Sequence, residues 1–149
     1  MNDTLQLFGD LEIIVTDSNG NIKSRNFEKN IITTVGKEYI ASRMLSTTTP
    51  PTAVTHMAIG TGIGEPLAAN TTLGTEEARV AFTSATVSGA QLTFSATFPP
   101  GSPATLKSIT EAGIFNAASA GTMLNRAKFS AVGKDTGDTL TINWTVTLT

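Results

Sequence analysis

The chain has 149 residues, a formal net charge of −2 at pH 7, no cysteine and a single histidine. This length suffices for one domain with a sizeable hydrophobic core. The composition excludes disulfides, thiolate metal sites, cysteine nucleophiles and sites that need two histidines from one chain. The weak net charge gives no electrostatic reason to expect nucleic-acid binding.

Threonine makes up about one residue in six, and charged residues only 15%. Threonine is β-branched and favours strands, where its hydroxyl can face solvent. An all-β domain with a neutral surface is therefore expected. No apolar run approaches the roughly 20 residues that span a bilayer, and the first residues lack the basic and apolar regions of a signal peptide. We expect a protein without membrane contact that acts where it is translated.

The first elements are a β-hairpin and a helix. Residues 11–17 and 22–28 are extended runs around a turn with Asn19-Gly20, the strongest short-range hairpin signal. From Thr34 to Met44 the apolar spacing becomes helical. Thr33 or Thr34 is expected to cap this helix, and the Thr47–Pro51 run to end it.

The remainder of the chain is predicted to be β-structure joined by loops. Its last expected strand alternates apolar residues with Thr and Asn, which indicates one buried face. The expected strands cover residues 54–59, 77–87, 91–98, 105–116, 122–130 and 138–148.

Eight or so short strands predict an antiparallel β-sandwich or jelly roll in a single domain, residues 1–149. Within it, residues 53–149 would form the sandwich, and residues 1–50 would supply the hairpin and helix. A lone hairpin is marginally stable in water. The segment 1–50 is therefore expected to dock on the sandwich or to clamp onto a neighbouring subunit.

Residues 56–66, HMAIGTGIGEP, place Gly60, Gly62 and Gly64 at alternate positions after an apolar strand. A phosphate-binding loop needs a helix N-terminus after its glycines and usually a lysine. Here Glu65 and a proline follow instead. We therefore expect the glycines to form a bend, through positive φ angles or close backbone approach, and we assign no cofactor.

His56 is the only imidazole, and no carboxylate or nucleophile is near it in sequence. It is interpreted as a structural or interface residue. Two alternatives stay open: a catalytic role, or an ion site formed by copies of His56 at a symmetry axis. The close acidic pairs, Glu76 with Glu77 and Asp135 with Asp138, are interpreted as solvated. No catalytic or metal-ligating residue is assigned.

Four charged residues fall within predicted strands that otherwise carry few charges: Arg79, Glu111, Arg126 and Lys128. Two interpretations are open. They protect strand edges or form surface ion pairs, or they form salt bridges between subunits.

Several segments together resemble a family of small structural proteins of tailed bacteriophages, variously described as capsid-associated or tail-fibre-like. The segments, in chain order, are NIITTVGKEYIASRML, HMAIGTG, TTLGTEEARV, ITEAGIFNAASAGTMLNRAKF and DTLTINWTVTL. The resemblance covers nearly the whole chain and implies a virion component.

A small β domain with a docking segment is similar to capsid cement or decoration proteins. The favoured expectation is thus a non-enzymatic dimer or trimer that is made in the host cytoplasm and binds the major capsid protein on the outer head. The alternative is a tail or tail-fibre component that contacts tail proteins or a host receptor. Contacts are expected in segments 1–34, 61–75 and 99–104. The candidate interface residues are Phe8, Ile13, Phe27, Gly60, Gly62, Gly64, Arg79 and Arg126.

Overall fold

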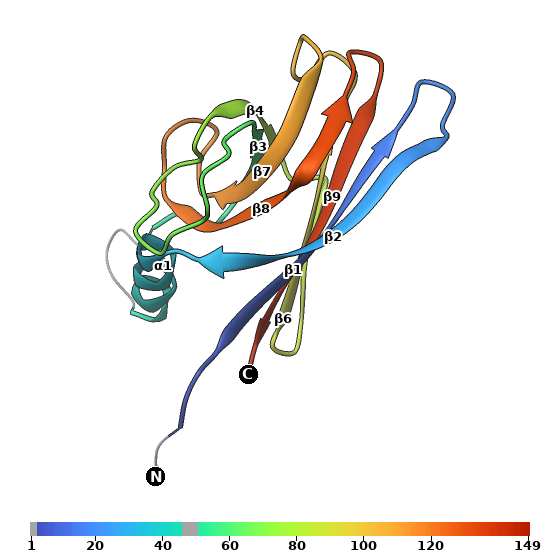
Figure 1. The fold of residues 1–149 in the computed structure, drawn as a ribbon. Helices are drawn as coiled ribbons and strands as arrows, with labels where there is room; N and C mark the ends of the chain where they lie inside the picture. Colours follow the sequence, from blue (N-terminus) through green and yellow to red (C-terminus); the bar gives the residue numbers. More distant parts are fainter. Residues whose placement is uncertain (1–2, 46–50) are drawn as a thin grey trace.

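Nine strands and one helix are present in the computed structural model, which describes residues 3–45 and 51–149. The strands pair antiparallel in one sheet, in the order β4-β3-β7-β8-β2-β1-β9-β6-β5 (Figure 1). This confirms an antiparallel all-β fold with one short helix. The elements are β1 (Leu7–Thr16), β2 (Ile22–Ile32), α1 (Thr34–Met44), β3 (His56–Gly60), β4 (Glu76–Ala81), β5 (Ser84–Ser88), β6 (Gln91–Phe98), β7 (Lys107–Phe115), β8 (Met123–Lys134) and β9 (Thr139–Leu148).

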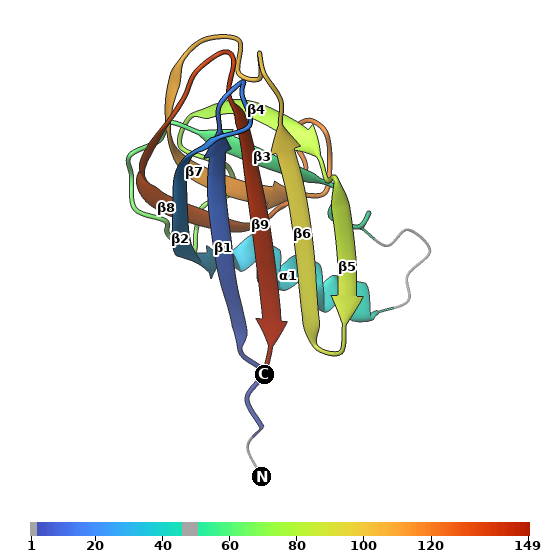
Figure 2. The same cartoon turned by 90° about the vertical axis from the view of Figure 1, so that its right-hand side faces the viewer.

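The sheet curls, so that β3, β7 and β8 lie behind β1, β9 and β6 and run across them (Figure 2). Apolar side chains from both parts of the sheet fill the space between. Alternation in β9 supplies one side, as expected, with Leu140, Ile142 and Trp144 completely buried. Ile59 and Ile114 contribute from the other side to the same cluster. The core therefore lies inside the curl.

Strand β2 connects the two parts of the sheet. It pairs with β1 as far as Lys29 and then with β8 from Asn30 to Ile32. The expected hairpin is confirmed, but it is central in the sheet, since β1 also pairs with β9 along its whole length. Among the described residues, β2 pairs with β8 only from Asn30 to Ile32, so residues 22–29 have β1 as their one strand partner. Clamping of the segment 1–50 onto a neighbouring subunit stays a prediction.

Helix α1 begins where expected. The Thr33 side chain accepts a hydrogen bond from the Gly36 N–H at 3.0 Å, which satisfies one free amide of the first turn. A Cβ at Gly36 would lie 2.0 Å from the Leu124 carbonyl oxygen, so glycine lets the helix approach β8 closely. The helix ends at Met44, and residues 47–50 of the expected stop at Thr47–Pro51 lie outside the described residues. No helix of the described chain has the length and apolar character needed to cross a membrane.

The segment 77–87 was expected as one strand, and this is wrong. It forms β4, which pairs with β3, and β5, which pairs with β6. Between them the Phe82 ring lies 4.9 Å from the Phe94 ring, where the chain passes from one part of the sheet to the other. The apolar alternation changes phase at this break, from Ala78, Val80 and Phe82 to Ala85 and Val87, and the single expected strand overlooked this signal. β4 and β5 consequently become the two edges of the sheet.

Candidate functional site

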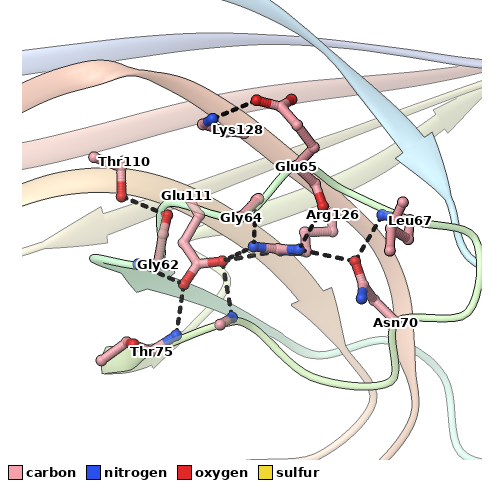
Figure 3. Close-up of polar contacts among 11 residues, drawn as sticks. Gly62, Gly64, Glu65, Leu67, Asn70, Thr75, Thr110, Glu111, Arg126 and Lys128 are labelled. Atoms are coloured by element: carbon pink, nitrogen blue, oxygen red, sulfur yellow. Dashed lines mark hydrogen bonds and ion pairs between the residues drawn. The ribbon is translucent and has the colours of Figure 1, made fainter.

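The glycine segment after β3 encloses the side chain of Glu111 (Figure 3). Strand pairing places Glu111 opposite Gly60 on one side and opposite Lys128 on the other. Its carboxylate points out of the sheet, away from the main core, and is covered by the loop 61–75. The side chain is completely buried.

Three backbone amides donate hydrogen bonds to this carboxylate. The N–H groups of Gly62 and Thr75 reach Oε1 at 2.9 and 2.8 Å, and that of Gly74 reaches Oε2 at 3.0 Å. The Thr110 hydroxyl donates to the Gly62 carbonyl at 2.8 Å and fixes the same turn. The beginning and the end of the loop are therefore fastened to one carboxylate.

Arg126 on β8 completes the arrangement. Its Nε and Nη2 lie 2.9 and 2.7 Å from Oε2 of Glu111. The same guanidinium donates to the Asn70 side chain at 2.8 Å and to the carbonyls of Gly64 and Glu65 at 3.1 and 3.4 Å. Because a guanidinium carries five donors in a fixed plane, one side chain fixes the middle of the loop.

Close approach explains two of the three glycines. A Cβ at Gly60 would lie 2.2 Å from the Thr75 carbonyl oxygen, and one at Gly62 would lie 2.3 Å from Oε1 of Glu111. A Cβ at Gly64 would meet no atom within 4 Å. The φ angles of all three lie outside the left-handed region. Of the two expected reasons for these glycines, close approach is the one found.

The surroundings favour the ionised form of Glu111. Burial raises the pKa of this carboxyl, but the N–H groups of Thr75 and Gly74 and the Arg126 guanidinium lower it more, so the net shift is downward. The amides of this loop thus surround an anion that belongs to the protein itself. An external phosphate would have to displace Glu111 from both its amide donors and its arginine.

Several candidate interface residues are buried within the chain. Ile13 is completely buried in the core, and Arg126 is 3% exposed. Gly60 and Gly62 are also buried, beneath the loop. Direct contact of these four residues with a partner is therefore a wrong prediction. The salt bridge of Arg126 lies within one chain, so neither the surface nor the intersubunit interpretation of Glu111 and Arg126 holds.

The remaining candidate interface residues differ in how far they are exposed to solvent. Phe8 is 49% exposed and Phe27 69% exposed, and Gly64 is exposed. The Arg79 side chain is only 8% exposed and forms a salt bridge with Glu76 at 2.7 Å. Its guanidinium also lies over the Phe115 ring, 3.7 Å from the centroid. Contact of Phe8, Phe27 and Gly64 with a partner stays a prediction.

The acidic pairs are less solvated than expected. Glu77 binds Lys107 at 2.8 Å, and Asp138 is buried and binds Lys23 at 2.6 Å. A solvated face is thus the wrong interpretation for these two carboxylates. His56 is half-buried, and its Nδ1 lies 2.7 Å from the Thr55 hydroxyl.

The outer side of the loop 61–75 displays two apolar side chains. Ile63 is 81% exposed and Leu67 is 60% exposed. Their positions are fixed from beneath, since the Arg126 guanidinium binds the Gly64 carbonyl and Asn70, which in turn accepts the Leu67 N–H at 2.7 Å. We call Ile63 and Leu67 with the loop that carries them the loop surface. Sequence reasoning selected the segment but missed these two side chains.

Comparisons with protein-family models, with curated proteins and with solved structures gave no match for this chain. Within residues 3–45 and 51–149, no group of three or more His, Asp or Glu side chains is placed to share a metal ion.

Proposed function

We propose that this protein is a non-enzymatic structural component of a tailed-bacteriophage virion, and specifically a cement or decoration protein that binds the assembled head. The observation that carries the proposal is the loop surface. A buried ion pair and several backbone hydrogen bonds fix a loop that displays Ile63 and Leu67 to solvent. The sequence resemblance to phage structural proteins supports the same conclusion.

A fixed loop suits binding because little conformational entropy is lost when a partner contacts it. Exposed apolar residues on a polar surface are typical contact points. The buried charges of Glu111 and Arg126 bind each other and the backbone of the loop 61–75. These contacts support a structural role for the two residues, in which they hold the loop in place for recognition. In this proposal the two facing parts of the curled sheet form a β-sandwich, which carries the loop. The partner is the major capsid protein.

The proposed mechanism is mass action on the assembled shell. A protein that binds the assembled capsid and not the free subunit shifts the equilibrium toward assembly, and the shift grows with its concentration relative to its Kd. Many copies on a regular lattice add their contributions, so that each contact can be weak. The outer surface of the head is the corresponding location.

A second candidate function is a tail or tail-fibre component that contacts the host surface. The observation in its favour is an open groove on the outer face of the sheet, lined by Phe27, Asp10, Asn143 and Thr145 among others. An exposed aromatic ring beside carboxylate, amide and hydroxyl groups provides both stacking and hydrogen bonding. These are the contacts that a sugar ring of a host glycan would need.

Binding to DNA-free heads tests the first proposal. Heads assembled from the major capsid protein of the same phage are mixed with purified protein, sedimented, and heated with and without it. We expect co-sedimentation and a higher head melting temperature. The double variant I63D/L67D should bind at least tenfold more weakly, whereas I22D, which changes an exposed residue far from the loop, should bind normally. Absence of binding by the unmodified protein would overturn the proposal, and immunogold labelling of tails would support the second one.

A further inference from the structure

The two edges of the sheet differ in charge. Edge strand β4 carries Glu76, Glu77 and Arg79. Edge strand β5, residues Ser84–Ser88, carries no charge and no proline, and all five residues are exposed. Uncharged exposed edges are ready to pair with another strand, and proteins ordinarily protect them with charge, proline or a bulge. The unprotected edge of β5 therefore points to a pairing surface.

The hairpin fixes which backbone groups of β5 face outward. Its loop has only Gly89 and Ala90, so Ser88 and Gln91 form the hydrogen-bonded pair that closes it. The backbone N–H and C=O groups of successive residues point to opposite edges of a strand. Those of Thr86 therefore point toward β6, while those of Ala85 and Val87 point toward the free edge. Among the described residues, no strand pairs with that edge.

We propose that two copies of this chain pair through β5, antiparallel, about a two-fold axis at Thr86. The sequence Ser-Ala-Thr-Val-Ser suits this arrangement because it is nearly self-complementary. Thr86 would lie opposite the partner's Thr86, and Ser84 opposite the partner's Ser88. Ala85 would lie opposite the partner's Val87, so that a large and a small apolar side chain meet.

The pairing uses the groups that the single chain leaves open. Ala85 and the partner's Val87 exchange two backbone hydrogen bonds, and the symmetric pair exchanges two more. Hydroxyl residues opposite one another are favourable cross-strand neighbours, and no like charges meet. Val87, 70% exposed in the single chain, gains a neighbour. The outcome is one sheet that continues through both copies.

A second copy fits this edge better than a different partner, because an isologous contact requires a surface complementary to itself. A five-residue strand buries far less than the roughly 1,600 Å² of a standard stable interface. The pairing is therefore weak between free molecules and becomes effective when many copies are held at high local concentration. The inference rests on the proposed function only for that last point.

Engineered cysteines test the register directly, because the natural chain has none. In this arrangement the two Thr86 residues form a non-hydrogen-bonded pair with Cα atoms about 4.5 Å apart, within reach of a disulfide. We expect T86C to give a disulfide-linked dimer under mild oxidation. S84C and S88C, each alone, are matched controls that should stay monomeric, because like residues would lie about 13 Å apart. A mixture of S84C and S88C should give the heterodimer.

Sedimentation of the unmodified protein at up to about 1 mM provides a second measurement, with expected weak dimerisation. V87K, which places a charge on the edge, should reduce it at least tenfold. Failure of T86C to cross-link faster than S84C or S88C overturns the pairing, and so does protection of the Ala85 and Val87 amides by heads instead of by a second copy. If the unmodified protein does not dimerise but binds heads normally, this inference alone is overturned. Dimerisation without head binding overturns the proposed function alone.

Discussion

Glu111 on β7 and Arg126 on β8 form a salt bridge in which Oε2 and Nη2 lie 2.7 Å apart, with 0% and 4% of their side chains exposed. Burying two charges costs solvation free energy that their attraction only partly repays. The remaining hydrogen-bonding capacity of both groups is directed at the loop 61–75. The pair therefore contributes specificity to one loop conformation, and loss of either partner leaves a buried charge uncompensated.

Replacing Arg126 with Met should lower the free energy of unfolding by about 3–5 kcal/mol, since it leaves the Glu111 carboxylate buried without its cation. Urea unfolding monitored by fluorescence of Trp144 would measure this loss. R25M is the control, because Arg25 is 54% exposed in its ion pair with Glu12, and its effect should stay within about 1 kcal/mol. Equal effects of the two substitutions would contradict the role assigned to the buried pair.

Gly62→Ala should loosen the loop surface. The new Cβ would lie 2.3 Å from Oε1 of Glu111 and 2.9 Å from the Gly74 Cα, so the carboxylate or the backbone has to move. We expect faster amide hydrogen exchange at Thr75 and faster proteolysis within residues 61–75. Gly64→Ala is the matched control, because its Cβ would meet open space and should leave both rates unchanged. A loop equally protected in both variants would show that close packing at Gly62 is unnecessary.

Stability should fall in acid, in part because of Glu111. The pKa of this carboxyl is lowered on folding from its ordinary 4.5, so the unfolded chain binds protons more readily. The resulting stabilisation is fully present above about pH 4.5 and is lost as the pH falls through the lower folded-state pKa. Unfolding midpoints measured between pH 7 and pH 2.5 should show this decline.

The Glu111→Gln variant identifies the contribution of that one carboxyl. It should be less stable than the natural protein at pH 7 and should lose less on acidification. Part of the decline should persist, because Lys23 and the Asp135 amide lower the pKa of Asp138. If the natural protein and E111Q decline in parallel, the Glu111 carboxyl does not contribute to acid sensitivity.

Asn125→Leu should stabilise the protein. Asn125 on β8 is completely buried, and neither Oδ1 nor Nδ2 has a hydrogen-bond partner among the described residues. An unsatisfied buried amide costs about 1–3 kcal/mol, and leucine has a similar volume without that cost. Thermal unfolding should show a raised Tm. A lower Tm would mean that the amide is satisfied by a buried water.

The sequence allowed the element types to be predicted where the local pattern was strong. The alternation in 138–148 and the Asn19-Gly20 turn each matched the observed strands, and Thr33 caps the helix as one of two candidates. The order of the strands in the sheet could not be predicted from the sequence. Partners that are far apart in the sequence decide it, and no local pattern shows that β2 changes from β1 to β8 at Asn30.

The sequence indicated some residues of the site around Glu111, but not how they contact one another. Glu111 and Arg126 stood out as charges within apolar strands, but only their pairing across β7 and β8 shows that each neutralises the other. The missing lysine and helix favoured a bend over a phosphate loop, and close backbone approach is observed at Gly60 and Gly62. That the Gly62 amide binds a carboxylate 49 residues further along depends on the register of β3 with β7, which the local sequence does not specify.

The central position of β9 has a kinetic consequence. β9 lies between β1 and β6, and Leu11 pairs with Trp144. Contacts between such distant residues close a long loop, which slows folding. On the ribosome, β1 and β6 emerge long before their shared neighbour, so their inner edges stay open until the final strand leaves the exit tunnel. Completion of the sheet therefore waits for β9, and its pairing with both neighbours is the step that joins β1 to β6.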